Sequence, residues 1–60
     1  MAERFVCASA SVCETFDDIV SAKEFAKVES EKSGERVIIY LQCGTMCGAV
    51  AYFLGGVENG

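Results

Sequence analysis

Hydrophobic and polar positions along the chain follow three successive patterns. Residues 4–10, RFVCASA, form a short apolar run without glycine or proline, which is consistent with a buried strand. From residue 15 to residue 33 the apolar positions recur at helical spacing and gather on one broad face at 100° per residue. That face comprises Phe16, Ile19, Val20, Ala22, Phe25 and Ala26. The pattern predicts a strand followed by an amphipathic helix.

Both ends of the expected helix carry recognisable signals. Thr15 and Asp18 have the capping-box spacing, in which a hydroxyl and a carboxylate each bind a backbone N–H of the first turn. Lys32 lies in the last turn, where the helix dipole favours a cation. Gly34 suits the left-handed conformation that commonly ends a helix. The predicted helix therefore covers residues 15–33.

Two runs rich in β-branched and aromatic residues follow, over 36–43 and roughly 46–54, and each predicts a strand. Between them, Gly44 and Thr45 form a Gly-X pair, which favours a two-residue type II′ turn and an antiparallel hairpin. The expected fold is a single α+β domain, residues 1–60, of β-α-β-β order, with one helix packed on a three-stranded sheet. If the first strand runs parallel to its neighbour, the crossover through the helix is right-handed.

Side chains on both faces of this hairpin are apolar. Alternation places Val37 and Ile39 on one face and Ile38 and Tyr40 on the other. A sheet with one wet face normally alternates apolar and polar residues, and a single helix covers only one side. The uncovered side is expected to bind a second copy of the chain, giving a homodimer or higher oligomer. The expected interface residues are Ile38, Tyr40, Ala49, Ala51 and Phe53.

An alternative interpretation places part of the hairpin in a membrane. Residues 37–57 carry no charge, and uncharged apolar runs of about 18 or more residues are candidates for a membrane span. Gly44 and Gly48 have the GxxxG spacing of packed membrane helices. Four glycines, the polar Gln42 and the β-branched run at 37–39 argue against this hypothesis. The hairpin is the preferred prediction, and a single membrane span is the alternative.

The four cysteines suggest a second alternative, a zinc-binding module. Four-cysteine zinc sites usually consist of two C-x2–4-C pairs. Cys43 and Cys47 fit this spacing, whereas Cys7 and Cys13 are farther apart. A two-residue turn would also direct Cys43 and Cys47 to opposite faces, and buried free cysteine is common in proteins. Reduced thiols and no cofactor are therefore expected, with these four cysteines as the alternative zinc ligands.

The charged and catalytic side chains narrow the functional classes. The chain has no histidine, which is the commonest general base and the usual activator of a nucleophile, so no enzymatic activity is expected. A net charge of −4 with only five cationic side chains provides no basic footprint for nucleic acid. The first residues lack the positive segment and long apolar core of a signal peptide. A cytoplasmic location, where thiols stay reduced, is therefore expected.

Acidic residues gather on the expected helix. Asp17, Glu24 and Glu31 are spaced by seven, so that neighbours in this row would lie about 10 Å apart. Such a row is either a solvated surface or a binding site for a basic partner. The chain matches no family motif, and its short, acidic, non-catalytic profile is similar in type to the small inhibitors that phages and mobile elements make. The expected function is protein–protein binding, with inhibition of a larger protein as one form of it.

Overall fold

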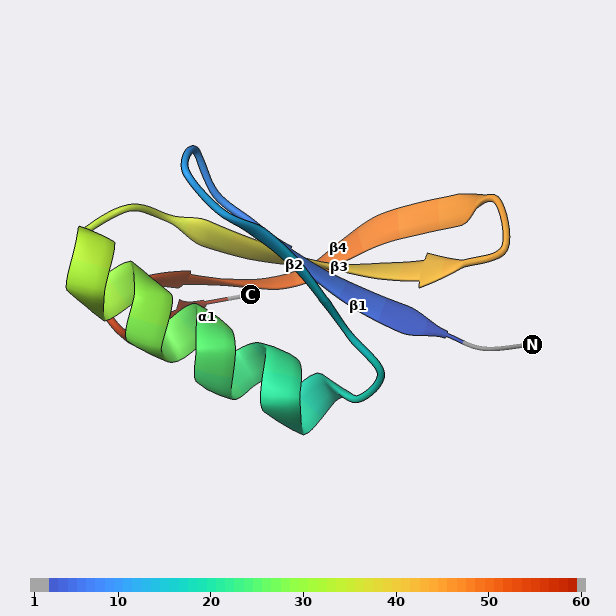
Figure 1. Cartoon of the computed structure of the whole chain (residues 1–60), viewed down its shortest axis with the longest axis horizontal. Coiled ribbons are helices and arrows are strands. Elements are labelled where there is room, and N and C mark those ends of the chain that lie inside the picture. Colours follow the sequence, from blue (N-terminus) through green and yellow to red (C-terminus); the bar gives the residue numbers. More distant parts are fainter. Residues whose placement is uncertain (1–2, 60) are drawn as a thin grey trace.

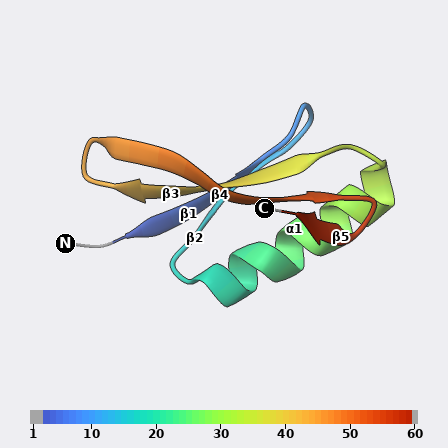
Figure 2. The ribbon, with the colours of Figure 1, turned by 180° about the vertical axis from the view of Figure 1, so that it is seen from behind.

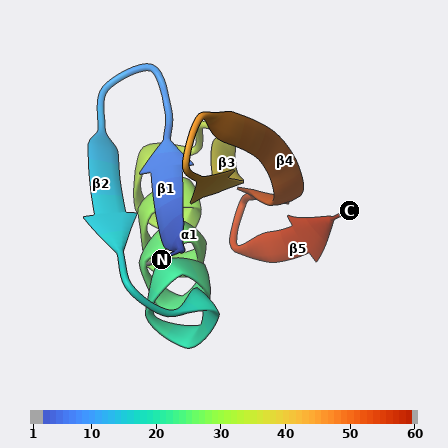
Figure 3. The ribbon, with the colours of Figure 1, turned by 90° about the vertical axis from the view of Figure 1, so that its right-hand side faces the viewer.

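A computed structural model describes residues 3–59 and shows one helix lying along a five-stranded antiparallel sheet (Figure 1). The elements are β1 (Arg4–Ala8), β2 (Cys13–Phe16), α1 (Ile19–Ser33), β3 (Val37–Cys43), β4 (Met46–Leu54) and β5 (Val57–Asn59). The strands lie in the order β2-β1-β3-β4-β5, so that β2 and β5 form the two edges of the sheet (Figure 3). The α+β class is confirmed. The expected three-stranded β-α-β-β order is wrong, because these two edge strands extend the sheet.

The first hairpin, β1–β2, occupies the expected beginning of the helix. Ser9 donates its backbone N–H to the carbonyl oxygen of Val12 at 2.7 Å across the turn. Thr15 pairs with Val6 across the two strands, so it caps no helix. Asp18 is the N-cap instead, with extended backbone and no side-chain capping hydrogen bond. The predicted capping box is therefore wrong, and the extra reversal of the chain makes β3 antiparallel to β1.

Helix α1 ends where the sequence predicts and packs small side chains against the sheet. Gly34 has a φ of 75° and donates its N–H to the carbonyl oxygen of Ser30 at 2.9 Å, which confirms the left-handed helix end. Ala22 and Ala26 are fully buried. Val20 was expected on the same face but is 62% exposed, because it lies about 200° around the helix from Ala22. The buried face is thus narrower than the predicted one.

Two glycine turns build the other half of the sheet. Gly44 has a φ of 61° and Thr45 has a negative φ, as a type II′ turn requires, so the predicted two-residue hairpin is confirmed. Gly55 and Gly56 have φ values of 61° and 83°. Positive φ at both central positions is the requirement of a type I′ turn, and this turn connects β4 to β5. This second turn and the strand that follows it were not among the elements expected from the sequence.

A β-bulge interrupts the pairing of β3 with β4. Tyr40 pairs with Ala49, whereas the preceding Ile39 pairs with Ala51, which leaves Val50 as the extra residue of β4. The extra residue shifts the alternation of side chains by one position. Residues of β4 beyond the bulge therefore lie on the opposite face from the one that a regular hairpin would give them.

Helix α1 covers one face of the sheet and leaves the other bare (Figure 2). The core beneath the helix contains Cys7, Ala22, Ala26, Val37, Ile39 and Phe53, with Phe5, Phe16, Ile19 and Phe25 packed against it. We call the other side the open face. It is formed by Arg4, Val6 and Ala8 of β1, Ile38, Tyr40 and Gln42 of β3, Cys47, Ala49, Tyr52 and Leu54 of β4, and the residues of β2 and β5 that pair beside them.

Residues 37–57 form two strands, their connecting turn and the turn into β5. The alternative expectation of one continuous membrane-spanning segment over this range therefore does not match the elements found. Within residues 3–59, α1 is the only helix, and it falls short of the length and apolarity that crossing a membrane demands.

Candidate interaction surface on the open face

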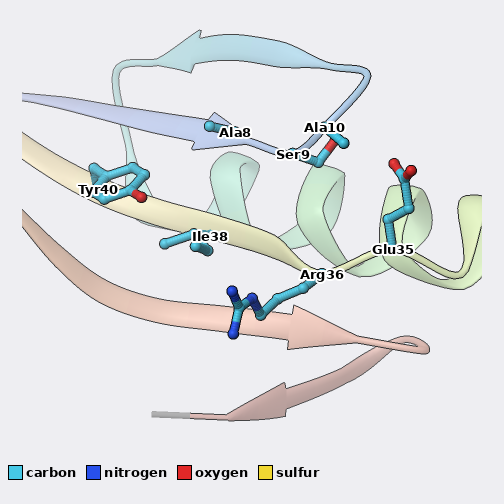
Figure 4. A pocket seen from close by; sticks show the side chains of 7 residues that line it. All are labelled: Ala8, Ser9, Ala10, Glu35, Arg36, Ile38 and Tyr40. Carbon is cyan, nitrogen blue, oxygen red and sulfur yellow. The ribbon is translucent and has the colours of Figure 1, made fainter.

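The centre of the open face has two shallow depressions on either side of Ile38. One has a volume of about 450 Å³ and lies between the start of β3 and the β1–β2 turn (Figure 4). Its lining residues are Ala8, Ser9, Ala10, Glu35, Arg36, Ile38 and Tyr40. The other has a volume of about 370 Å³ and is lined by Arg36, Ile38, Ala49, Val50, Ala51 and Tyr52. Arg36 and Ile38 border both depressions, so the two form one continuous, mainly apolar surface.

Polar contacts hold the rim of this surface. The guanidinium of Arg36 lies over the ring of Tyr52, with Cζ 5.7 Å from the ring centroid, which is within the range of a cation–π interaction. The hydroxyl of Ser11 donates a hydrogen bond to the Glu35 carboxylate at 3.0 Å, which joins the β1–β2 turn to the segment before β3. Figure 4 shows Arg36 just before β3 and Ile38 and Tyr40 along it, with α1 behind the strands.

Charges are divided between the two sides of the molecule. The strand positions of the open face include Arg4 and no carboxylate, and Arg36 and Glu35 border the same face, where both line one of its depressions. The acidic side chains of the helix, and those of Glu14 and Glu58, lie on the other side of the sheet. Lys23 of α1 pairs with Glu58 at 2.9 Å on that side. The open face is therefore apolar and weakly cationic, although the whole chain is acidic.

The structure separates the five residues expected at the interface. Ile38, Tyr40 and Ala49 lie on the open face. Ala51 and Phe53 are buried against α1, with exposed fractions of 8% and 4%, so their assignment to the same surface is wrong. In a regular two-residue hairpin Ile38 would oppose Ala51, and all five side chains would share a face. The bulge changes this arrangement.

The expected row of three acidic residues is wrong at one end. Asp17 precedes α1 and lies in the connection from β2, because the helix begins only at Ile19. Glu24 and Glu31 are both exposed on α1, and exposed Lys27 lies between them in the sequence. The helix thus presents two of the three predicted carboxylates.

The four cysteines are free and occupy different sides of the sheet. Cys7 is fully buried, and its thiol donates to the carbonyl oxygen of Ala22 at 3.3 Å. Burial, with smaller effects from Cys13 and Glu14, raises the pKa of this thiol to about 11. Cys13 pairs with Ala8 on the open face, on the opposite side from Cys7.

The other two cysteines are also directed apart. Cys43 pairs with Met46 and Cys47 pairs with Gln42, so that adjacent pairs of the hairpin place these thiols on opposite faces. Within residues 3–59 no three side chains of histidine, cysteine, aspartate or glutamate are grouped so as to hold a metal ion. The alternative zinc module is therefore not supported by the positions of its expected ligands.

The tip of the β3–β4 hairpin carries a smaller apolar surface. The end of the hairpin that carries the β3–β4 turn extends past the N-terminal end of α1 (Figure 1). A depression of about 250 Å³ lies here, and Met46 is 75% exposed. This surface has no charged residue among those that line it.

Several residues of the candidate surface were missed by the sequence analysis. Arg36 was expected only as the beginning of a strand, and Tyr52 was not among the residues expected at the interface. Their positions follow from the bulge, which pairs Tyr52 with Ile38. The regular alternation of apolar residues in β4 contains no signal of it. No protein-family model, curated protein or solved structure matches this chain.

Proposed function

We propose that this protein acts by protein–protein binding through its open face, and that a second copy of the chain is an occupant of that face. The observation that carries the proposal is the bare apolar surface around Ile38 and Tyr40, on the side of the sheet that α1 does not cover. One-sided antiparallel sheets normally expose polar side chains. An apolar exposed face is typical of an interaction site.

The composition and size of the open face support this proposal. Tyr40, Tyr52 and Arg36 belong to the residue types that are enriched at protein interfaces. A stable interface buries about 800 Å² on each partner, which is about one fifth of the 3929 Å² surface of this chain. One side of a small two-layer molecule provides a surface of that order.

Catalysis is not part of the proposed function. The chain contains no histidine. The thiol of Cys7 is buried and its pKa is raised to about 11, which keeps it protonated and inert near neutral pH. Inhibition of a larger protein and a cytoplasmic location stay predictions from the sequence.

Sedimentation equilibrium over a range of micromolar concentrations tests self-association. The wild-type protein is expected to show species heavier than the 6.4 kDa chain. Tyr40→Glu places a charge at the centre of the open face and is expected to shift the protein toward the monomer. Thr45→Glu adds the same charge at the exposed β3–β4 turn and is the matched control. A wild-type protein that stays monomeric at every concentration would refute the proposal.

A further inference from the structure

The outer side of α1 carries two apolar side chains that nothing in the fold covers. Val20 is 62% exposed and Val28 is 58% exposed. Glu24 and Glu31, also exposed, lie on the same side at helical spacing. We call Val20, Glu24, Val28 and Glu31 the outer stripe. It alternates apolar and acidic residues along the side of the helix that faces away from the sheet, and exposed Lys27 lies at its margin, one turn before Glu31.

The outer stripe and the open face are complementary in charge and in length. The open face has Arg36 at one end and Arg4 at the other, beside Gln42. Arg36 and Gln42 are six residues apart along the chain, so the two arginines are separated by about 20 Å. Helix α1 has 15 residues and a length of about 22 Å. A helix laid along β3 would therefore span the distance between the two arginines.

We propose that the outer stripe of one copy docks on the open face of another copy. This inference rests on the proposed self-association and specifies its geometry. Val20 and Val28 pack against the apolar surface around Ile38, and Glu24 and Glu31, about 10 Å apart along the helix, lie between the two arginines. The docked helix supplies the second covering layer that each sheet lacks, in the helix-on-sheet arrangement that its own α1 already makes on the other side.

Charge distinguishes this geometry from a face-to-face pairing of two sheets. In a face-to-face dimer, Arg4 and Arg36 of each copy would meet an open face that has no carboxylate at its strand positions and only Glu35 at its border. The valines of the outer stripe would also remain exposed. Docking of helix on sheet pairs opposite charges and buries both apolar surfaces in one contact.

The proposed contact is heterologous, because two different surfaces meet. A pair of copies joined in this way retains one free open face and one free outer stripe, so that association continues into a ring or a filament. Sedimentation of the wild-type protein is accordingly expected to show masses that exceed a dimer and rise with concentration.

A complementation experiment tests this geometry. The helix variant, V20K/V28K, blocks the outer stripe with two cations. It is expected to fold, since both positions are exposed and lysine has a higher helix propensity than valine. The sheet variant, Tyr40→Glu, blocks the open face. Each variant alone is expected to sediment as a 6.4 kDa monomer, whereas an equimolar mixture forms a heterodimer of twice that mass.

The heterodimer forms because the helix variant retains an intact open face and the sheet variant retains an intact outer stripe. Circular dichroism verifies the fold of each variant. If Tyr40→Glu does not fold, Arg36→Glu replaces it, since Arg36 is exposed and precedes β3. Glu14→Lys, on the exposed β2 strand, changes the net charge as much as V20K/V28K does and is expected to assemble like the wild-type protein.

The outcomes separate this inference from the proposed function. If the helix variant assembles as the wild-type protein does while the sheet variant is monomeric, the open face binds another open face, and helix docking is wrong. Two monomeric variants that fail to combine when mixed would also contradict it. A monomeric wild-type protein would refute both proposals.

Discussion

The hydroxyl of Ser30 joins the helix to the last hairpin by accepting a hydrogen bond from the backbone N–H of Gly56 at 3.0 Å. The same hydroxyl donates to the carbonyl oxygen of Lys27 at 3.1 Å. Ser30 is fully buried, and it is the only buried polar residue within residues 3–59. This contact fixes the β4–β5 turn against α1, and thereby the edge strand β5 that the sequence analysis missed.

Replacing Ser30 with alanine is expected to lower the free energy of unfolding by about 1–3 kcal/mol, because the N–H of Gly56 loses its partner at a partly buried site. Chemical denaturation monitored by circular dichroism measures the loss. Ser21→Ala is the matched control, since Ser21 is exposed on the same helix and alanine has the higher helix propensity. Equal stability of the two variants would show that the buried contact contributes nothing.

Gly56→Ala is expected to destabilise the fold by about 1–2 kcal/mol, the cost of a left-handed conformation for a residue with a Cβ. Gly56 has a φ of 83°, and an added Cβ would lie 3.3 Å from the Cβ of Glu31. Gly48→Ala is the control, because Gly48 has ordinary φ and open space around it. Its stability is expected to change by less than about 0.5 kcal/mol. Comparable thermal unfolding of both variants would contradict the turn assignment.

Cys7 is expected to make stability depend on pH in the alkaline range. Burial raises the pKa of its thiol from 9.0 to about 11 in the folded protein, so the unfolded protein loses this proton at lower pH. The stability that comes from the raised pKa of Cys7 is therefore fully present below pH 9, and it is lost as the pH rises from 9 to about 11. Denaturation curves at successive pH values measure it.

Cys7→Ala provides the control, because this variant lacks the titrating thiol and its stability should fall less over the same range. Alkylation with iodoacetamide gives an independent measure. The exposed Cys13 and Cys47 are expected to react with the folded protein, whereas Cys7 reacts only on unfolding. Rapid labelling of Cys7 in the folded protein would disprove its burial.

Neutralising the outer stripe with E24Q/E31Q is expected to weaken self-association and to reduce its dependence on salt, since exposed charges are screened within about 8 Å at physiological ionic strength. Stability should barely change, because isolated surface charges contribute little to folding. Asp17→Asn is the control, as Asp17 lies outside the helix. Sedimentation at low and high salt provides the comparison, and an unaltered salt dependence in E24Q/E31Q would exclude these carboxylates from the contact.

Glycine positions and the alternation of side chains predicted those parts of the fold that depend only on residues close together in the sequence. Gly34 ends the helix and Gly44 begins the β3–β4 turn because each needs a positive φ, which glycine adopts without strain. The alternation of Val37 and Ile39 with Ile38 likewise identified the two faces of β3. The pair Gly55 and Gly56 carried the same kind of signal for a type I′ turn, so β5 was predictable from the sequence.

At the expected start of the helix, the sequence has the signal of a helix N-terminus, but the structure has a strand. Thr15 and Asp18 have the spacing of a capping box, yet Thr15 belongs to a strand and pairs with Val6. Strand β2 is short, polar and at the edge of the sheet, so it lacks the apolar alternation that marks a buried strand. Its pairing with β1 determines its conformation.

The sequence by itself determined that one helix would leave a second apolar face of the sheet uncovered, since apolar side chains alternate on both sides of the hairpin. Only the tertiary structure decided which residues form that face. The bulge at Val50 directs Ala51 and Phe53 into the core and brings Tyr52 beside Ile38. The bulge depends on how β4 fits against β3 and against the helix above it, which are far apart in the sequence. Its effect is large, because a shift of one residue exchanges the two faces of a strand.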